Sequence, residues 1–323
     1  MSLTHQMFLQ SLRELAGFEP EAFDSHRMPL IAWLVDHAWS EVPAYRARLA
    51  GVVVNQDLDL ARWCELPILR HDDIGALGIA LEARALPPEA SDVEEAPDQP
   101  PPLRRRSRLA TIAAECEREL FFEHNGLDLA APLAILHPDV RGPQEGQGWS
   151  ITFAQSKWIA GDPDADAMVQ HAWLGKSGAK LLRTNAEIGA RLAEEWPRLD
   201  VRPPIEAMII ADATLAPARR AAIEIATGVP VLHVIEQPGL GIIAASDPNG
   251  GYLIPAATSV VEVVDANGRP VPSGVVGELV ITPLYEYVVP RLRFATGVMA
   301  SPELNPATLI GVRRLSRVSD VSG

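Results

Sequence analysis

Short apolar runs separated by polar loops dominate the second half of the chain. Met208–Ala211 and Val231–Ile235 are runs of the kind that form buried strands, and both are rich in branched aliphatic residues. Between them Pro217 opens a helical segment that ends at Gly228. Strand, helix and strand at this spacing predict a parallel βαβ unit over residues 206–235.

The last quarter of the chain shows the alternation typical of antiparallel strands. Ser259–Val264 predicts a strand, and the Asn267-Gly268 pair is typical of a hairpin turn. Glu278–Thr282 predicts a buried strand that ends at a proline. We expect a further strand over Pro290–Phe294, followed by a turn at Thr296-Gly297.

Helical periodicity marks three segments elsewhere. Apolar residues recur at helical spacing from Pro29 to Leu49, and Pro43 should interrupt that helix. A second stripe runs from Leu109 to Leu120, after three consecutive arginines. In a third segment Asn185 is placed to cap a helix.

Composition narrows the class of protein. The chain has 323 residues, of which 47% are hydrophobic, so it can bury a sizeable core. Its formal net charge of −14 argues against a nucleic-acid-binding or anionic-membrane surface. We expect no transmembrane helix and no signal peptide. Cys64 and Cys116 stand far apart, which favours a reducing cytoplasm over a disulfide or zinc framework.

Residues 277–298, GELVITPLYEYVVPRLRFATGV, carry a family resemblance. The segment is similar to GELVxTxLxxxxxPLIRYxTGD of the phenylacetate–CoA ligase branch of the adenylate-forming enzymes. Weaker resemblances lie at 42–46, at 66–74 and at 315–320, where Asp320 falls in the family's hinge. The resemblance implies the large N-terminal α/β domain of that fold, with mixed sheets and flanking helices. The family's small C-terminal lysine-bearing domain is expected to be absent.

The positions that handle ATP and magnesium in the family are changed. Val298 replaces the aspartate that holds the ribose, and Gly239 replaces the magnesium-binding glutamate. Residues 95–101 stand in place of the phosphate loop, and there Pro97 and Pro100 have no N–H group to offer a phosphate. Glu236 is the one nearby carboxylate that could be a displaced ligand, although a solvated role is favoured. We therefore expect no cofactor, no metal and no catalytic residue.

The resemblance also implies an acyl pocket. Its matching positions are apolar or glycine: Ile235, Gly239, Gly241, Ala244 and Ala245. Such a lining suits a flat hydrophobic ring, so an aromatic or other carboxylic acid is a candidate ligand. The same residues could instead fill the vacated space as core. His137, His171 and Asp139 show no spacing that indicates a catalytic cluster.

Three functions remain open. The first is a homologue of the acid–CoA ligases that cannot activate acids with ATP and acts by binding an acid or by partnering an active synthetase. The second is an active ligase or transferase of altered mechanism. The third is a scaffold or homodimer without a small ligand. For domains, we expect a helical region over 1–85, an exposed irregular loop rich in proline and acids over 86–102, an α/β core over 103–250 and a β-rich part over 251–323.

Overall fold

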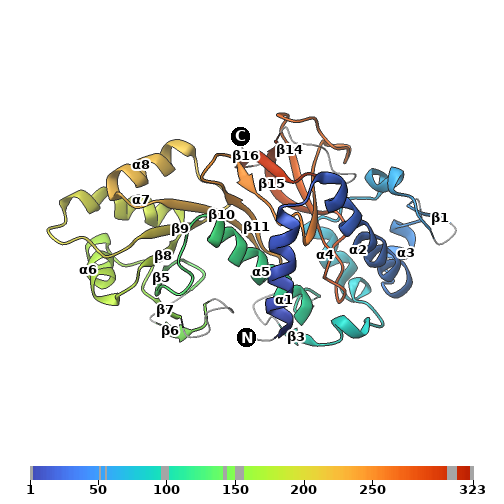
Figure 1. Cartoon of the computed structure of the whole chain (residues 1–323), viewed down its shortest axis with the longest axis horizontal. Helices are drawn as coiled ribbons and strands as arrows, with labels where there is room; N and C mark the ends of the chain where they lie inside the picture. The colour runs from blue at the N-terminus through green and yellow to red at the C-terminus, as the bar shows by residue number, and fades with distance from the viewer. Residues whose placement is uncertain are drawn as a thin grey trace. The chain divides into compact units, whose positions relative to one another are not determined.

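The structure is a computed structural model that describes residues 3–50, 52–54, 57–95, 102–140, 144–149, 156–303 and 311–320 (Figure 1). Its α-helices are α1 (Leu3–Ala16), α2 (Pro20–Glu41), α3 (Tyr45–Arg48), α4 (His71–Leu77), α5 (Arg108–His124), α6 (Ala167–Ser177), α7 (Ala186–Glu195) and α8 (Pro217–Thr227). Short 3-10 helices are η1 (Leu60–Glu65), η2 (Gly78–Leu81), η3 (Pro88–Ala90) and η4 (Trp196–Arg198).

The strands alternate with helices in the middle of the chain and follow one another at its end. They are β1 (Val53–Val54), β2 (Asp57–Leu58), β3 (Val93–Glu95), β4 (Arg105–Ser107), β5 (Leu133–Leu136), β6 (Gln144–Gln147), β7 (Lys157–Ala160), β8 (Leu181–Thr184), β9 (Ala207–Ala211), β10 (Val231–Gln237), β11 (Gly241–Ser246), β12 (Tyr252–Leu253), β13 (Ser259–Val264), β14 (Gly277–Pro283), β15 (Phe294–Pro302) and β16 (Arg314–Asp320). The mixed α/β fold class predicted from the sequence is confirmed.

The described chain forms two compact units. Unit 1 comprises residues 1–6, 118–236 and 244–249, and unit 2 comprises residues 7–117, 237–243 and 250–323. The chain passes between the units within α1, within α5, within β10, within β11 and between Asn249 and Gly250. The domain boundaries expected at residues 85, 102 and 250 stay predictions.

Unit 1 is built on a mostly parallel sheet. β9 pairs in parallel with β10 and with β8, and β8 pairs in parallel with β5. The predicted βαβ unit is therefore confirmed, with α8 as its crossover helix. Parallel strands are covered on their faces, which is why β9 is buried at every residue. Helices α6, α7 and α8 lie beside these strands in Figure 1, and they share one apolar core with them.

Local signals fix the helix ends of unit 1. The Asn185 side chain accepts a hydrogen bond from the Ile188 N–H at 2.9 Å, as expected for a helix N-cap. Asp166 does the same for α6 through the Met168 N–H. At the C-terminal end of α8, Gly228 takes a left-handed conformation with φ 71°, which glycine adopts without steric cost.

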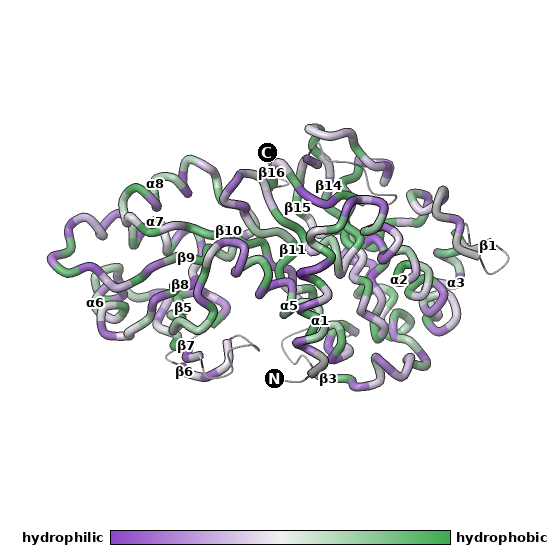
Figure 2. Tube along the Cα trace, viewed as in Figure 1, coloured by the Kyte–Doolittle hydropathy of each residue, from purple (hydrophilic) through white to green (hydrophobic). Residues whose placement is uncertain are grey.

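Unit 2 combines antiparallel strands with the N-terminal helices. β13 pairs with β14, β14 with β15, β15 with β16 and β16 with β12, all antiparallel. Figure 2 shows both hydrophobic and hydrophilic residues along α2, and the residues that this helix buries include Asp24 and Arg27 beside Ile31 and Leu34. This helix begins before the predicted segment, contains Pro29, and ends at Glu41 ahead of Pro43. Among the described helices none is long and apolar enough to cross a membrane.

Two sequence-based expectations are wrong. Pro290–Phe294 is not a strand: β15 starts at Phe294 and runs through the predicted turn at Thr296-Gly297. The reason is Arg293, whose φ of 51° bends the backbone just before the strand. The segment 86–102 is not free of regular structure either, because η3 and β3 lie within it and β3 pairs with β4. Residues 96–101 lie outside the described part of the chain.

Candidate ligand-binding site

The position of the family's ribose aspartate lies in a buried strand. Val298 belongs to β15, is 4% exposed, and stands opposite the predicted hinge residue Asp320 of β16. Its N–H donates to the Thr296 hydroxyl at 3.2 Å. An isopropyl group here has no hydrogen-bonding atom for a ribose hydroxyl, so the residue present does not fit that part of a nucleotide.

The position of the magnesium glutamate is occupied by backbone alone. Gly239 has φ 70°, and its carbonyl accepts a hydrogen bond from the Arg291 guanidinium at 2.5 Å. The neighbouring Pro238 carbonyl accepts from the same guanidinium at 3.4 Å. A guanidinium on this carbonyl puts positive charge where a magnesium ion would need an oxygen ligand. The donor set therefore does not fit magnesium.

The alternative ligand Glu236 is already paired. Its carboxylate contacts the Arg183 guanidinium at 2.7 Å in unit 1. Among the residues that the structure describes, no group of three or more His, Cys, Asp or Glu side chains could hold a metal ion. Pro97 and Pro100, which replace the phosphate loop in sequence, lie outside the described ranges.

The five residues predicted to line an acyl pocket fall in different units. Ile235, Ala244 and Ala245 are in unit 1 and are at most 1% exposed. Gly239 and Gly241 are in unit 2. Gly241 has φ 80°, and a Cβ atom added to it would lie 3.2 Å from the Cβ atom of Ala114. An aromatic pocket at these five positions stays a prediction.

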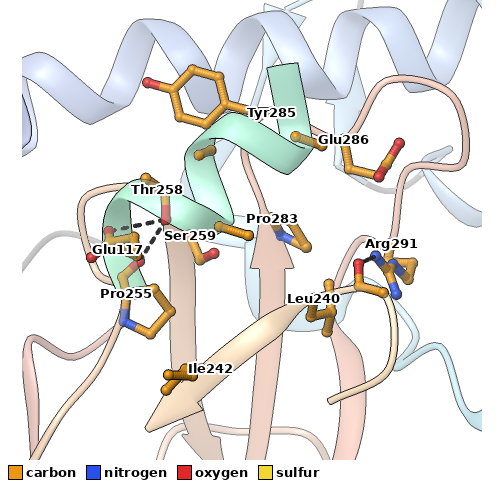
Figure 3. Close-up of a pocket in the computed structure, with 14 residues that line it drawn as sticks. Glu117, Leu240, Ile242, Pro255, Thr258, Ser259, Pro283, Tyr285, Glu286 and Arg291 are labelled. Atoms are coloured by element: carbon orange, nitrogen blue, oxygen red, sulfur yellow. Dashed lines mark hydrogen bonds between the residues drawn. The ribbon is translucent and has the colours of Figure 1, made fainter. Parts of the chain in front are cut away.

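A cavity lies within unit 2, and Gly239 is one of its lining residues (Figure 3). One wall is the face of α5 that carries Ala110, Ala113, Ala114 and Glu117. The other walls come from the β10–β11 turn and from the segments around residues 255–259 and 283–291. The volume is about 30 Å³. A benzene ring needs about 150 Å³ of apolar cavity, so this space does not take an aromatic ring as it stands.

Glu117 is a buried acid of the cavity. It is 6% exposed and its Oε1 atom accepts a hydrogen bond from the Thr258 hydroxyl at 3.0 Å, as Figure 3 shows. Burial raises the pKa of Glu117 to about 7, with hydrogen bonds from Thr258 opposing that rise. Burial, together with the nearby Glu117 carboxylate, also raises the pKa of Tyr285 to about 12.

Arg291 and Glu286 form the second polar group of the cavity. Burial lowers the pKa of Arg291 to about 10, and the Glu286 carboxylate opposes that change. Burial likewise raises the pKa of Glu286, against the effect of Arg291 and Arg106. Glu286 accepts from the Val288 N–H at 3.2 Å, whereas the buried Nε atom of Arg291 has no hydrogen-bond partner.

Sequence reasoning missed both Glu117 and Arg291. A signal for Glu117 was present, because it lies four residues after Ala113 and three before Leu120, on the apolar stripe of α5. A carboxylate on such a stripe is expected to be buried and therefore perturbed. Arg291 replaces an apolar residue of the resembled PLIRY pattern, and only the fold shows that its guanidinium reaches the Gly239 carbonyl.

The fold of this chain is similar to that of an acid–CoA ligase. A structure of 2-hydroxyisobutyryl-CoA ligase with 2-HIB-AMP and CoA in the thioesterification state is similar with a TM-score of 0.71 and 16% identity, over 94% of this chain and 69% of that one. An open conformation of the same ligase gives a TM-score of 0.69 and 17% identity, over 91% and 73%. Its postadenylation state with R3-HIB-AMP gives 0.67 and 16%, over 92% and 66%.

These similarities define the fold. The chain has the adenylate-forming ligase fold, as the segment 277–298 predicted, and it spans about two thirds to three quarters of the length of those ligases. No protein-family model matches the sequence, and no curated protein matches it. At 16–17% identity the likeness extends to the backbone and carries no activity with it.

Proposed function

We propose that this chain uses the adenylate-forming fold to bind a ligand or a partner protein and does not activate acids with ATP. For the second function considered from the sequence, an active ligase or transferase of altered mechanism, the candidate nucleophile among the described cavity residues is the Thr258 hydroxyl, which donates to Glu117; neither a thiol nor an imidazole is among those lining residues. Cys64 and Cys116 form no disulfide, which is consistent with a reducing cytoplasm, and we propose the cytoplasm as the location of the protein.

The hydrogen bond from Arg291 to the Gly239 carbonyl is the observation that carries this proposal. Adenylation of an acid needs a triphosphate held in line and its charge neutralised by a metal ion. In the resembled family a glutamate side chain holds magnesium at this position. Here a guanidinium contacts a backbone oxygen instead, and the ribose position is the buried Val298. We propose that the sequence 95–101 also fails as a phosphate loop, since its three prolines have no N–H and it contains no Ser, Thr or Gly.

Pyrophosphate exchange tests the proposal directly. With ATP, magnesium and a broad panel of aliphatic and aromatic acids, we expect no acid-dependent exchange of labelled pyrophosphate above a blank without protein. An active acid–CoA ligase assayed in parallel controls for the reagents. Exchange with any acid, abolished by unfolding the protein, contradicts the proposal.

The ligand or partner is a separate question with its own measurement. A thermal-shift panel of ATP, AMP, CoA and aromatic or other carboxylic acids tests the small-molecule ligands. A ligand held at about a hundred times its dissociation constant stabilises by about 2.7 kcal/mol, which such a panel detects. Sedimentation of the purified chain tests the expected homodimer, and co-purification with a full-length synthetase tests an active-synthetase partner.

A further inference from the structure

The charges around the unit 2 cavity do not balance. Of its described lining residues, Arg291 is the one cation, and Glu117 and Glu286 are the two acids. Glu286 is the acid that acts on Arg291, and Arg291 acts on Glu286 in return, together with Arg106, which does not line the cavity. Glu117 interacts with Thr258 and Tyr285, which are both neutral at pH 7. One carboxyl group therefore faces the cavity without a cation to compensate it.

A buried, uncompensated carboxylate has two ways to lower its free energy. It takes up a proton, which is what the raised pKa of Glu117 reports, or it meets a cation from outside. The cavity gives such a cation access to Glu117. Thr258 and Ser259, which also line the cavity, carry hydroxyl oxygens that can accept hydrogen bonds from an ammonium group.

The rest of the lining limits the body of the ligand. Ala113, Ala114 and Ile242 present methyl and methylene groups, so the part of the ligand beyond its charge should be apolar. A volume of about 30 Å³ takes about two or three water-sized groups, which excludes a ring and leaves room for a short chain. An anionic ligand would add a third negative charge beside Glu117 and Glu286.

We infer that the cavity is a binding site for a small protonated primary amine with a short alkyl chain, whose ammonium group pairs with the Glu117 carboxylate. This rests on the proposed function only in that the site binds rather than activates its ligand. Pyrophosphate exchange does not enter the test, so the two proposals can fail separately.

The experiment is calorimetric titration of the full chain at pH 8 with ethylammonium, acetate and ethanol. These probes have similar size and differ in charge. We expect saturable binding of ethylammonium, and no binding of ethanol or acetate at tenfold higher concentration. Glu117→Gln keeps the shape and removes the charge, and it should weaken ethylammonium binding at least tenfold. Glu65→Gln removes an exposed carboxylate of η1 and should bind like the wild type.

Two further measurements keep the inference falsifiable if Glu117→Gln affects folding. The ¹³C resonance of the Glu117 carboxyl should titrate at lower pH when ethylammonium is present, because a paired cation favours the ionised form. Affinity should rise with pH up to about 7 and then level off, while the ammonium stays protonated. Stronger binding of acetate would make Arg291 the binding group and overturn the inference. So would equal binding in Glu117→Gln, or no binding of any short alkylammonium.

Discussion

At the scale of single residues, the buried Arg293 links several segments of unit 2 through its guanidinium group. Its guanidinium contacts both oxygens of Glu262 at 3.1 Å and donates to the carbonyls of Cys64 and Leu66 at 2.9 and 2.7 Å. Trp63 donates to the same Glu262 carboxylate at 3.0 Å. This arginine is the one that matches the family's PLIRY pattern, and here it joins the N-terminal helical region to the antiparallel strands.

We predict that Arg293→Met destabilises the protein by about 3–5 kcal/mol. The substitution removes one partner of a pair that is at most 2% exposed and leaves the Glu262 charge buried without compensation. Urea unfolding measures the change. Arg70→Met is the matched control, because Arg70 pairs with Glu278 at 3.3 Å but is 56% exposed, and it should cost less than about 1 kcal/mol. Equal costs for the two variants would contradict the prediction.

Glu117 should make stability depend on pH. Its folded-state pKa of about 7 lies above the model-compound value of 4.5, so the folded state holds the proton more tightly than the unfolded state. Stability from this group is therefore complete below about pH 4.5 and is lost as the pH rises towards 7. Glu117→Gln has no such loss, and its advantage over the wild type should grow across this range to about 3 kcal/mol at pH 8.

Denaturant unfolding of both proteins between pH 4 and pH 8 checks this. The comparison is between variant and wild type, because the raised pKa values of Glu262 and Glu286 affect both proteins equally. A difference that stays constant over the whole range would show that the pKa of Glu117 is the same in the folded and unfolded states, and would contradict the prediction.

Residues of this kind mark the limit of what the sequence predicts. The position of Glu117 on an apolar stripe was visible, but its effect depends on Thr258 and Tyr285, which are more than 140 residues away in the chain. The positive φ of Arg293 was not visible, because arginine gives no signal for it. Long-range side-chain contacts stabilise both positions, and no local pattern encodes such contacts.

At the scale of elements, the sequence predicted a helix end correctly where a single capping residue determines it. Asn185 caps α7, and Ile188 and Leu192 on the buried face of that helix belong to the core of unit 1. We predict that Asn185→Ala costs about 1 kcal/mol, since the Ile188 N–H then loses its acceptor. Asn185→Ser keeps a capping oxygen and should cost less. Urea unfolding of the two variants separates loss of the cap from loss of side-chain volume.

The elements that were predicted wrongly depend on tertiary context. The βαβ unit and β14 have runs of apolar residues long enough to fix their type, and the Asn267-Gly268 turn fits the Gly268 φ of 76°. In contrast, β3 is three residues of Val-Glu-Glu that form a strand only because β4 lies opposite. Its register also sets Glu94 against Arg106, an ion pair that composition alone did not reveal.

At the scale of the whole molecule, the similarity of the backbone is not matched at the positions of the resembled motifs. The backbone is similar to an acid–CoA ligase over more than nine tenths of this chain, yet the side chains at the ribose and magnesium positions are an isopropyl group and a hydrogen atom. The similarity to those ligases is therefore one of fold, and it carries no ligand group at Gly239 or Val298.

The net charge of the chain should make its melting temperature depend on ionic strength. With a formal charge of −14, the folded chain repels itself, and the ion pairs that offset this are mostly on the surface, where each contributes little. Raising the ionic strength from about 0.01 to 0.15 M shortens the screening length from about 30 to 8 Å. We expect the melting temperature at pH 8 to rise over this range, because long-range repulsion is screened more than contacts at 3 Å.

Near pH 5.0, the isoelectric point, repulsion is small and the rise should vanish. Calorimetric scans in sodium chloride at the two pH values check this, and a melting temperature that falls with salt at pH 8 would mean that surface ion pairs outweigh the repulsion.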